Sequence, residues 1–279
     1  MTYSTDPTFP SGPRPNRIPS HDPRERPVVN LKDSHLRNLN RDGRSEPVRE
    51  QVLRSYDISI LLDDGSVQYI THKAPSELYL EDICACFARG TLISTESGQT
   101  AIEDLQPGDK VKTRDNGFQS LRWVSACSLV ARGEDLPEDS WPLRIKADAL
   151  GELRPIQDLL VSPRFRLLTN HPSCAALFGS AETLAPSIDL LDGDTVLRTR
   201  PSADLIFYNL MFDAHQIIEA NGLETESYHP GNFGVAVMSL EMQSHLRRIF
   251  PHMNGDLGKF GRTARPILKG FEAEVLRVG

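Results

Sequence analysis

Short runs of β-prone residues, separated by turn-forming residues, fill the chain from residue 86 to about residue 231 and most strongly constrain its fold. Asn116-Gly117 and Asn221-Gly222 are turn dipeptides, and Pro107-Gly108-Asp109 marks a further turn. We expect strands at Leu92–Thr95, Thr100–Ile102, Lys110–Thr113, Gln119–Val124, Leu143–Ala147, Leu159–Val161, Arg166–Thr169, Thr195–Arg198, Phe207–Phe212 and Gln216–Ala220. Short strands with frequent turns predict an all-β domain of antiparallel strands over residues 86–231.

The segments before this domain differ from each other in composition. Residues 1–50 contain eight prolines and few large apolar residues, so they cannot bury enough surface to offset the entropy of ordering. We predict a disordered arm there, with a docking arm as the alternative. In residues 51–85, Asp57–Leu62 and Val67–Thr71 flank an Asp-Gly turn, which predicts a β-hairpin. This hairpin either packs on the β domain or moves independently.

Residues 232–279 form a predicted C-terminal extension with one helix. Met238–Phe250 has apolar residues at helical spacing, and Pro251 ends the pattern. The residues expected on the apolar face are Leu240, Met242, Leu246, Ile249 and Phe250. A second, short helix is possible at the very end of the chain.

The composition excludes several partners. The 279 residues carry a net charge of -7, which does not favour binding to nucleic acid or to an anionic membrane. The first twenty residues contain five prolines and no apolar run, so no secretory signal is visible. No apolar stretch is long enough to insert in a membrane. We expect a protein that is cytoplasmic or exported by a route without such a signal; its external partners stay open.

Four cysteines, Cys84, Cys86, Cys127 and Cys174, lack the spacing of a zinc site or a Cys-x-x-Cys pair. We therefore expect no metal and no cofactor, and a disulfide scaffold is not expected at this size. Cys84 and Cys86 would share one side of a strand, so a redox or metal pair is an alternative. A buried, inert Cys86 is another.

Five blocks carry a family resemblance. They are Cys86-Phe87-x-x-Gly90-Thr91, Leu105-x-Pro107-Gly108-Asp109-x-Val111, Asp115-Asn116-Gly117-Phe118, Leu160-Val161-Ser162-Pro163-x-x-Arg166, and the closing pair Asp213-x-His215 with Asn221-Gly222-x-x-x-Glu226-Ser227-Tyr228-x-Pro230-Gly231. In this order they resemble the Hint domain, which Hedgehog C-terminal domains and inteins share. The tail, with Ala264-Arg265-Pro266-x-Leu268 and Glu272-Ala273, is similar to that of a bacterial Hedgehog/intein-like branch.

The resemblance implies self-cleavage between Ala85 and Cys86. The Cys86 thiolate would attack the Ala85 carbonyl to form a thioester, an intramolecular step favoured by proximity. A general acid must protonate the leaving nitrogen. Water, a thiol or an alcohol would then open the thioester and release residues 1–85. The substrate is the chain's own N-terminal segment, so the domain would act once instead of turning over.

One residue departs from the family pattern. Phe165 stands where the family has the histidine that protonates the scissile nitrogen, and a phenyl ring carries no such proton. His215 is our substitute acid, with Asp213 as the residue that orients its ring. His171 is six residues beyond Phe165 and would need a bend to reach the site. Ser162 either binds the substrate carbonyl or caps a turn.

Three functional alternatives follow. The chain has no His-Asn step and no terminal asparagine, so splicing of the flanking segments is not expected. The first hypothesis is self-cleavage, impaired by Phe165. The second is a degenerate Hint fold kept as a binding or structural module. The third, a hydrolase acting in trans, lacks a recognisable strand–nucleophile–helix setting.

Overall fold

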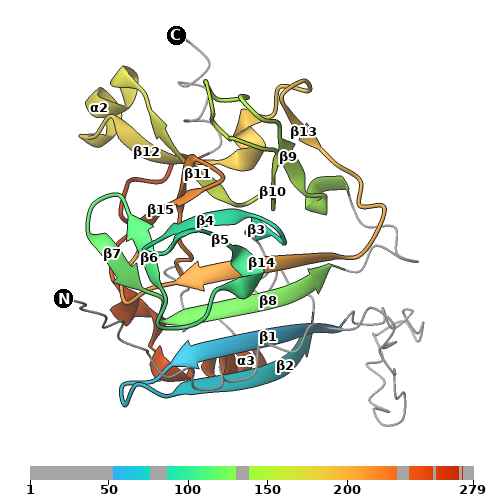
Figure 1. Cartoon of the computed structure of the whole chain (residues 1–279), viewed down its shortest axis with the longest axis vertical. Helices are drawn as coiled ribbons and strands as arrows, with labels where there is room; N and C mark the ends of the chain where they lie inside the picture. Colours follow the sequence, from blue (N-terminus) through green and yellow to red (C-terminus); the bar gives the residue numbers. More distant parts are fainter. Residues whose placement is uncertain are drawn as a thin grey trace, which may run out of the picture. The chain divides into compact units, whose positions relative to one another are not determined.

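The computed structural model describes residues 53–75, 87–129, 138–230, 239–253, 256–269 and 272. The predicted arm, both residues of the Ala85–Cys86 bond and the end of the tail lie outside these ranges. Within them, the chain folds mainly into two sheets of antiparallel strands, which confirms the all-β class (Figure 1). The described residues contain two α-helices, α2 (Pro172–Phe178) and α3 (Leu240–Ile249), and neither is long and apolar enough to cross a bilayer.

The first sheet contains β1 (Leu53–Leu61), β2 (Val67–Pro75), β3 (Phe87–Ala88), β8 (Trp123–Leu129), β9 (Leu143–Ile145), β10 (Leu159–Val161), β13 (Val196–Arg198) and β14 (Leu205–Met211). The spatial order is β13-β9-β10-β3-β14-β8-β1-β2, so neighbours in the sheet are often distant in the sequence. The short strand β3 therefore lies in the interior of the sheet, between β10 and β14.

The second sheet contains β4 (Leu92–Thr95), β5 (Gly98–Ala101), β6 (Lys110–Thr113), β7 (Gly117–Ser120), β11 (Arg166–Asn170), β12 (Glu182–Pro186), β15 (Ile217–Ala220) and β16 (Leu223–Glu226). Its order is β12-β11-β16-β15-β4-β6-β7, with β5 paired to β4. The β15–β16 turn is Asn221-Gly222, and both residues have positive φ, as a tight two-residue hairpin requires. Here the turn dipeptide correctly predicted the connection.

Residues 53–75 form the expected hairpin, and it packs on the rest of the chain. β1 pairs with β2 along its whole length, and Gly65 in the turn has a φ of 82°. β1 also pairs with β8, from Tyr56 opposite Cys127 to Ile60 opposite Trp123. The hairpin thus extends the first sheet, which settles the question that the sequence left open.

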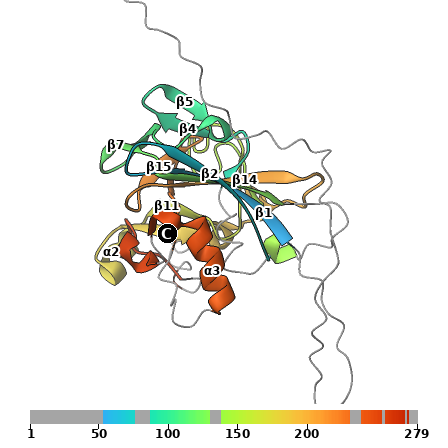
Figure 2. The ribbon, with the colours of Figure 1, turned by 90° about the horizontal axis from the view of Figure 1, so that it is seen from below.

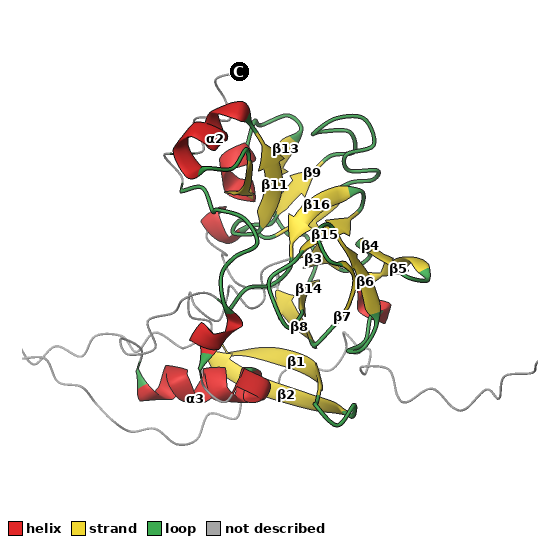
Figure 3. Cartoon of the chain, turned by 90° about the vertical axis from the view of Figure 1, so that its left-hand side faces the viewer, coloured by secondary structure: helices red, strands yellow, loops and turns green. Residues whose placement is uncertain are grey.

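One apolar cluster joins the two sheets, and a second joins the first sheet to the C-terminal extension. The larger one takes side chains from both sheets, including Phe87, Ile93 and Phe165. The second joins β1, β8 and α3, where Trp123 stacks on Tyr228 and donates its indole N–H to the Ile249 carbonyl at 3.0 Å. Helix α3 lies along the hairpin (Figures 2 and 3).

Several sequence predictions were wrong in detail. The expected strand Gln119–Val124 is divided at Leu121-Arg122 between β7 and β8. β12, β16 and α2 were missed. Leu240 was placed on the apolar face of α3, but it begins the helix and is 80% exposed. Met242, Leu246 and Ile249 form the buried face, as expected.

The remaining short elements are 3-10 turns. They span Ile102–Asp104, Glu138–Ser140, Ser187–Leu190, Pro251–Met253 and Leu257–Phe260. The first two connect strands, the third follows β12, and the last two continue the chain beyond α3. Near its C-terminal end the chain lies against β12, where Ile267 and Leu184 form an isolated parallel bridge.

Candidate functional site

Strand β3 fixes the backbone immediately after the predicted nucleophile. Phe87 is paired with Val161 of β10 on one side and with Tyr208 of β14 on the other. A tight turn follows, in which Gly90 has a φ of 87° and the Thr91 hydroxyl donates to the Ala88 carbonyl at 2.7 Å. These contacts explain why the block requires glycine and threonine at these two places.

The Glu103 carboxylate stabilises this turn by hydrogen bonds. Its carboxylate accepts the Gly90 N–H at 2.9 Å and the Arg89 side-chain N–H at 3.3 Å. Burial acts to raise the pKa of Glu103, but the hydrogen bonds outweigh burial and leave the pKa below its usual value. An ionised Glu103 thus holds the turn that leads out of β3.

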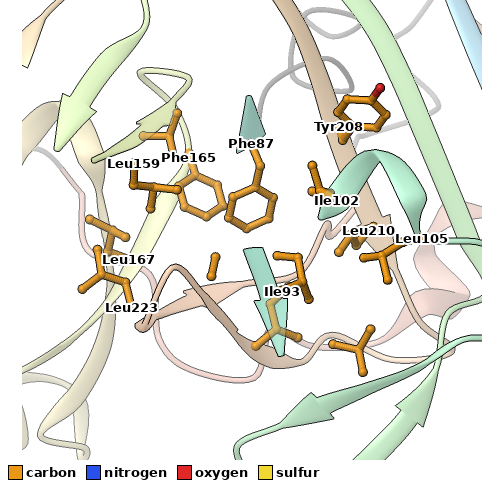
Figure 4. Packing of buried hydrophobic residues seen from close by; sticks show 14 of the residues in the cluster. Phe87, Ile93, Ile102, Leu105, Leu159, Phe165, Leu167, Tyr208, Leu210 and Leu223 are labelled. Carbon is orange, nitrogen blue, oxygen red and sulfur yellow. The ribbon is translucent and has the colours of Figure 1, made fainter. Parts of the chain in front are cut away.

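Phe165, which stands where the family resemblance implies a histidine, fills its position with hydrocarbon. It is 1% exposed, and its ring meets the ring of Phe87 edge-on, with the centroids 4.7 Å apart (Figure 4). Phe165 therefore packs in the apolar core. The residue next to the predicted nucleophile is therefore covered by a side chain that can neither donate nor accept a proton.

Two polar residues directly follow the strand residues that pair with Phe87. Ser162 follows Val161 of β10, and Asn209 follows Tyr208 of β14. Both residues are buried, with exposures of 8% and 0%. The Ser162 hydroxyl has no hydrogen-bond partner among the residues that the structure describes.

Ser162 begins a turn through its backbone, but its hydroxyl does not cap that turn, contrary to one interpretation of the sequence. Its carbonyl accepts the Phe165 N–H at 3.2 Å and the Ser187 hydroxyl at 2.9 Å. These bonds use the Ser162 backbone and leave its hydroxyl unpaired within the described residues. Sequence reasoning missed Asn209; the signal was one amide inside the apolar run Phe207–Phe212.

His215 is buried and both of its ring nitrogens have backbone partners. Nε2 lies 2.9 Å from the Ser227 carbonyl, and Nδ1 accepts the Ala264 N–H at 2.9 Å. Because Nδ1 accepts the Ala264 N–H, Nδ1 itself carries no hydrogen. The neutral ring therefore carries its hydrogen on Nε2 and donates it to the Ser227 carbonyl. His229 packs edge-on against this ring, and burial is the main cause that lowers the pKa of His229.

Asp213 and Glu226 occupy places that the sequence did not predict. Asp213 was expected to orient the His215 ring, but it lies in a turn and accepts a hydrogen bond from Arg122 at 2.7 Å. Glu226 is 6% exposed, and Arg166 donates to both of its oxygens. A Glu226 oxygen is 3.5 Å from His215 Nε2, so Glu226 is the carboxylate nearest the imidazole in the recorded contacts.

The remaining histidine and cysteine candidates have other surroundings. His171 caps the N-terminus of α2 and accepts the Ser173 N–H at 3.3 Å. Cys174 is a buried free thiol, whereas Cys127 is disulfide-bonded. Within the described ranges, no three His, Cys, Asp or Glu side chains gather in an arrangement that could hold a metal ion.

The comparison with protein families identifies the chain. The family model described as Hint domain matches residues 85–232, just over half of the sequence. The chain therefore belongs to the Hint domain family, and its two antiparallel sheets are the all-β fold expected for that family. A search of curated proteins gave no match.

Proposed function

We propose that this Hint domain cleaves its own chain between Ala85 and Cys86 through a thioester. The observation that supports the proposal is the place of Ser162 and Asn209, two buried polar residues that directly follow the two residues paired with Phe87. Phe87 is bonded directly to the proposed nucleophile. Ser162 and Asn209 are therefore our candidates for the groups that meet the scissile peptide.

The first step is an isomerisation. The Cys86 thiolate attacks the Ala85 carbonyl carbon, a C–S bond forms, and the C–N bond of the same peptide breaks. The nitrogen takes a proton and becomes the free amine of Cys86. The Ser162 hydroxyl and the Asn209 amide are the groups that we expect to bind the carbonyl oxygen as it gains negative charge.

The second step opens the thioester. A thiol attacks the Ala85 carbonyl carbon, the C–S bond to Cys86 breaks, and the Cys86 thiolate leaves. Water or an alcohol would attack the same carbonyl carbon and give an acid or an ester at Ala85. The products are residues 1–85 with a new acyl end, and residues 86–279.

Proton supply limits the rate in this proposal. Phe165 contributes none. His215 stays the proposed acid, but its Nδ1 must first part from the Ala264 N–H before it can carry a second proton. Losing that hydrogen bond costs about 0.5–1.5 kcal/mol, which slows the step without forbidding it. Asp213 pairs with Arg122, so we assign the orienting contacts of His215 to Ser227 and Glu226.

A degenerate Hint fold is the second candidate function. It is favoured by the same two observations, the phenyl ring at 165 and the fully bonded imidazole at 215. In that case the chain serves as a binding or structural module, and the Ser162 hydroxyl is a remnant of the site.

An intact-mass measurement separates these two functions. The purified full-length chain is incubated at neutral pH with and without dithiothreitol, and the masses are followed over days. Thiol-dependent appearance of a fragment that ends at Ala85 supports self-cleavage. A chain that keeps its full mass under both conditions supports the degenerate module.

A further inference from the structure

The hairpin β1–β2 belongs to the fragment that self-cleavage would separate from the domain, yet it is built into the domain's sheet. Residues 51–279 form one compact unit that includes both the hairpin and the Hint domain. From this arrangement, and resting on the proposed function, we infer that a cut before Cys86 leaves the two fragments bound to each other. The product would be a two-chain protein, and residues 1–85 would not be released.

Backbone pairing makes the first attachment. β1 and β8 are matched over five residue pairs, from Tyr56–Cys127 to Ile60–Trp123. Beyond the last pair, the Leu61 N–H donates to the Arg122 carbonyl at 2.8 Å, and the Arg122 side chain donates to the Leu61 carbonyl at 3.2 Å. Departure of the hairpin would leave an interior strand of the sheet as an unpaired edge.

Apolar side chains make the second attachment. Tyr56, Ile58 and Ile60 of β1 are at most 2% exposed and lie in one cluster with Trp123 of β8. The same cluster includes Met242, Leu246, Ile249 and Phe250 of the C-terminal extension. Removing the hairpin would expose these side chains to water, which opposes dissociation.

Helix α3 makes the third attachment, on the β2 side. The rings of His72 in β2 and His245 in α3 share a hydrogen bond of 2.8 Å between Nε2 and Nδ1. Ala74 of β2 is fully buried in the shared cluster. Both β8 and α3 are in the fragment after the cut, so the hairpin contacts that fragment through both of its strands (Figure 2).

The inference has a consequence for what the cut achieves. Cleavage would break one covalent connection and create a new acyl end and a new amine, while residues 1–52 stay joined to the domain through the hairpin. A partner attached to the N-terminal arm would therefore remain on the Hint domain after processing. The partner's release would need a further event that opens the sheet.

A site-specific protease tests this inference independently of self-cleavage. In a Cys86→Ala chain, a recognition sequence for such a protease is inserted between residues 76 and 84, the chain is cut completely, and the product is passed over a sizing column. Dithiothreitol is present, because Cys127 is disulfide-bonded and a covalent link must not imitate association. We expect a single peak near the 31.1 kDa of the intact chain; two separate peaks would overturn the inference.

A matched pair of variants locates the attachment. Ile58→Ala with Ile60→Ala should increase the fraction that dissociates after the cut, whereas Lys73→Ala, at an exposed position of β2, should leave the single peak unchanged. Should the double variant fail to fold before cutting, hydrogen exchange of the cut parent chain decides. Continued protection of the β1 amides supports the bound fragment, and their loss contradicts it.

Discussion

Position 165 and position 215 are the two places where the family resemblance puts proton chemistry, and this chain treats them in opposite ways. Phe165 has hydrocarbon around it and packs on Phe87. His215 has polar partners: the Ser227 carbonyl and the Ala264 N–H contact its two nitrogens, and a Glu226 oxygen is nearby. Phe165 has no proton to transfer. His215 has one, but that proton is already in a hydrogen bond to the Ser227 carbonyl.

The difference teaches that this fold holds an apolar ring at one of these positions and a hydrogen-bonded imidazole at the other. The apolar site contributes stability, because a phenyl ring in a close-packed core gains contacts that an imidazole would not. The polar site ties the closing residues of the domain to the C-terminal extension through the Ala264 N–H. The segment Phe87–Thr91, which follows the proposed nucleophile, forms a short strand and a tight turn.

Removing the nucleophile should have the largest effect. Cys86→Ala lacks the sulfur that forms the thioester, so cleavage before residue 86 should disappear altogether. The matched control is Cys174→Ala, which removes a buried free thiol far along the chain and should cleave like the parent. Intact mass measures both. A Cys86→Ala chain that still breaks at the same bond would remove Cys86 from the mechanism.

Restoring an imidazole at position 165 should have the next largest effect. Phe165→His places a general acid beside Phe87, and we expect cleavage to accelerate by about 10²–10⁴-fold. The variant should also be less stable, because a polar ring replaces a buried phenyl group. Phe165→Leu is the control: it keeps the site apolar and should not accelerate cleavage. Equal rates in both variants would mean that another group already supplies the proton.

Loosening the polar site should have a smaller effect. Arg265 bonds to Asp115 and Glu182 and so holds the segment that presents the Ala264 N–H. Arg265→Gln should free His215 Nδ1 and speed cleavage by about 2- to 10-fold, the kinetic equivalent of one hydrogen bond. The control Arg262→Gln changes charge equally at an exposed position.

The same test has an internal check. In a His215→Gln background, Arg265→Gln should no longer change the rate, since the ring that it releases is gone. A gain that persists without His215 would show that the segment acts on cleavage in another way, and His215 would lose its proposed role as the acid.

Acid should weaken the region around α3 to a modest extent. Burial is the main cause that lowers the pKa of His252 to about 4, from an ordinary value near 6.5. The unfolded chain therefore binds a proton at His252 in a pH range where the folded chain does not. The free energy of unfolding should fall as the pH drops from about 6.5 toward 4. In His252→Gln the decrease between pH 7 and pH 5, measured by urea unfolding, should be smaller; parallel decreases would contradict this.

The sequence predicted strands best where turn residues marked both ends. Leu92–Thr95, Lys110–Thr113 and Leu159–Val161 were predicted with the bounds that the structure has. β16 was missed because Leu223–Glu226 contains one apolar residue and three polar ones, which is not the pattern of a buried strand. Its Glu226 side chain is buried beside Arg166, a partner that is distant in the sequence. β12 ends at Pro186 and follows a helix, so no local alternation indicated it.

The candidate site was harder to predict than the fold, because its contacts are not local. Glu226 is buried only because Arg166, sixty residues earlier in the chain, supplies its charge partner. The sequence identified His215 but not the Ala264 N–H that occupies its Nδ1, which comes from 49 residues away. Asn209 becomes a candidate site residue only when the register of β3 and β14 is known.

Hydroxylamine trapping of the acyl intermediate tests the central claim most directly. Hydroxylamine attacks a thioester readily and an ordinary peptide bond slowly, so it should convert Ala85 to a hydroxamate at the end of the N-terminal fragment. We predict this product, identified by mass spectrometry, in the parent chain and its absence in Cys86→Ala. A parent chain that stays intact in hydroxylamine, with no modified Ala85, would contradict thioester formation and leave the Hint fold as an inert module.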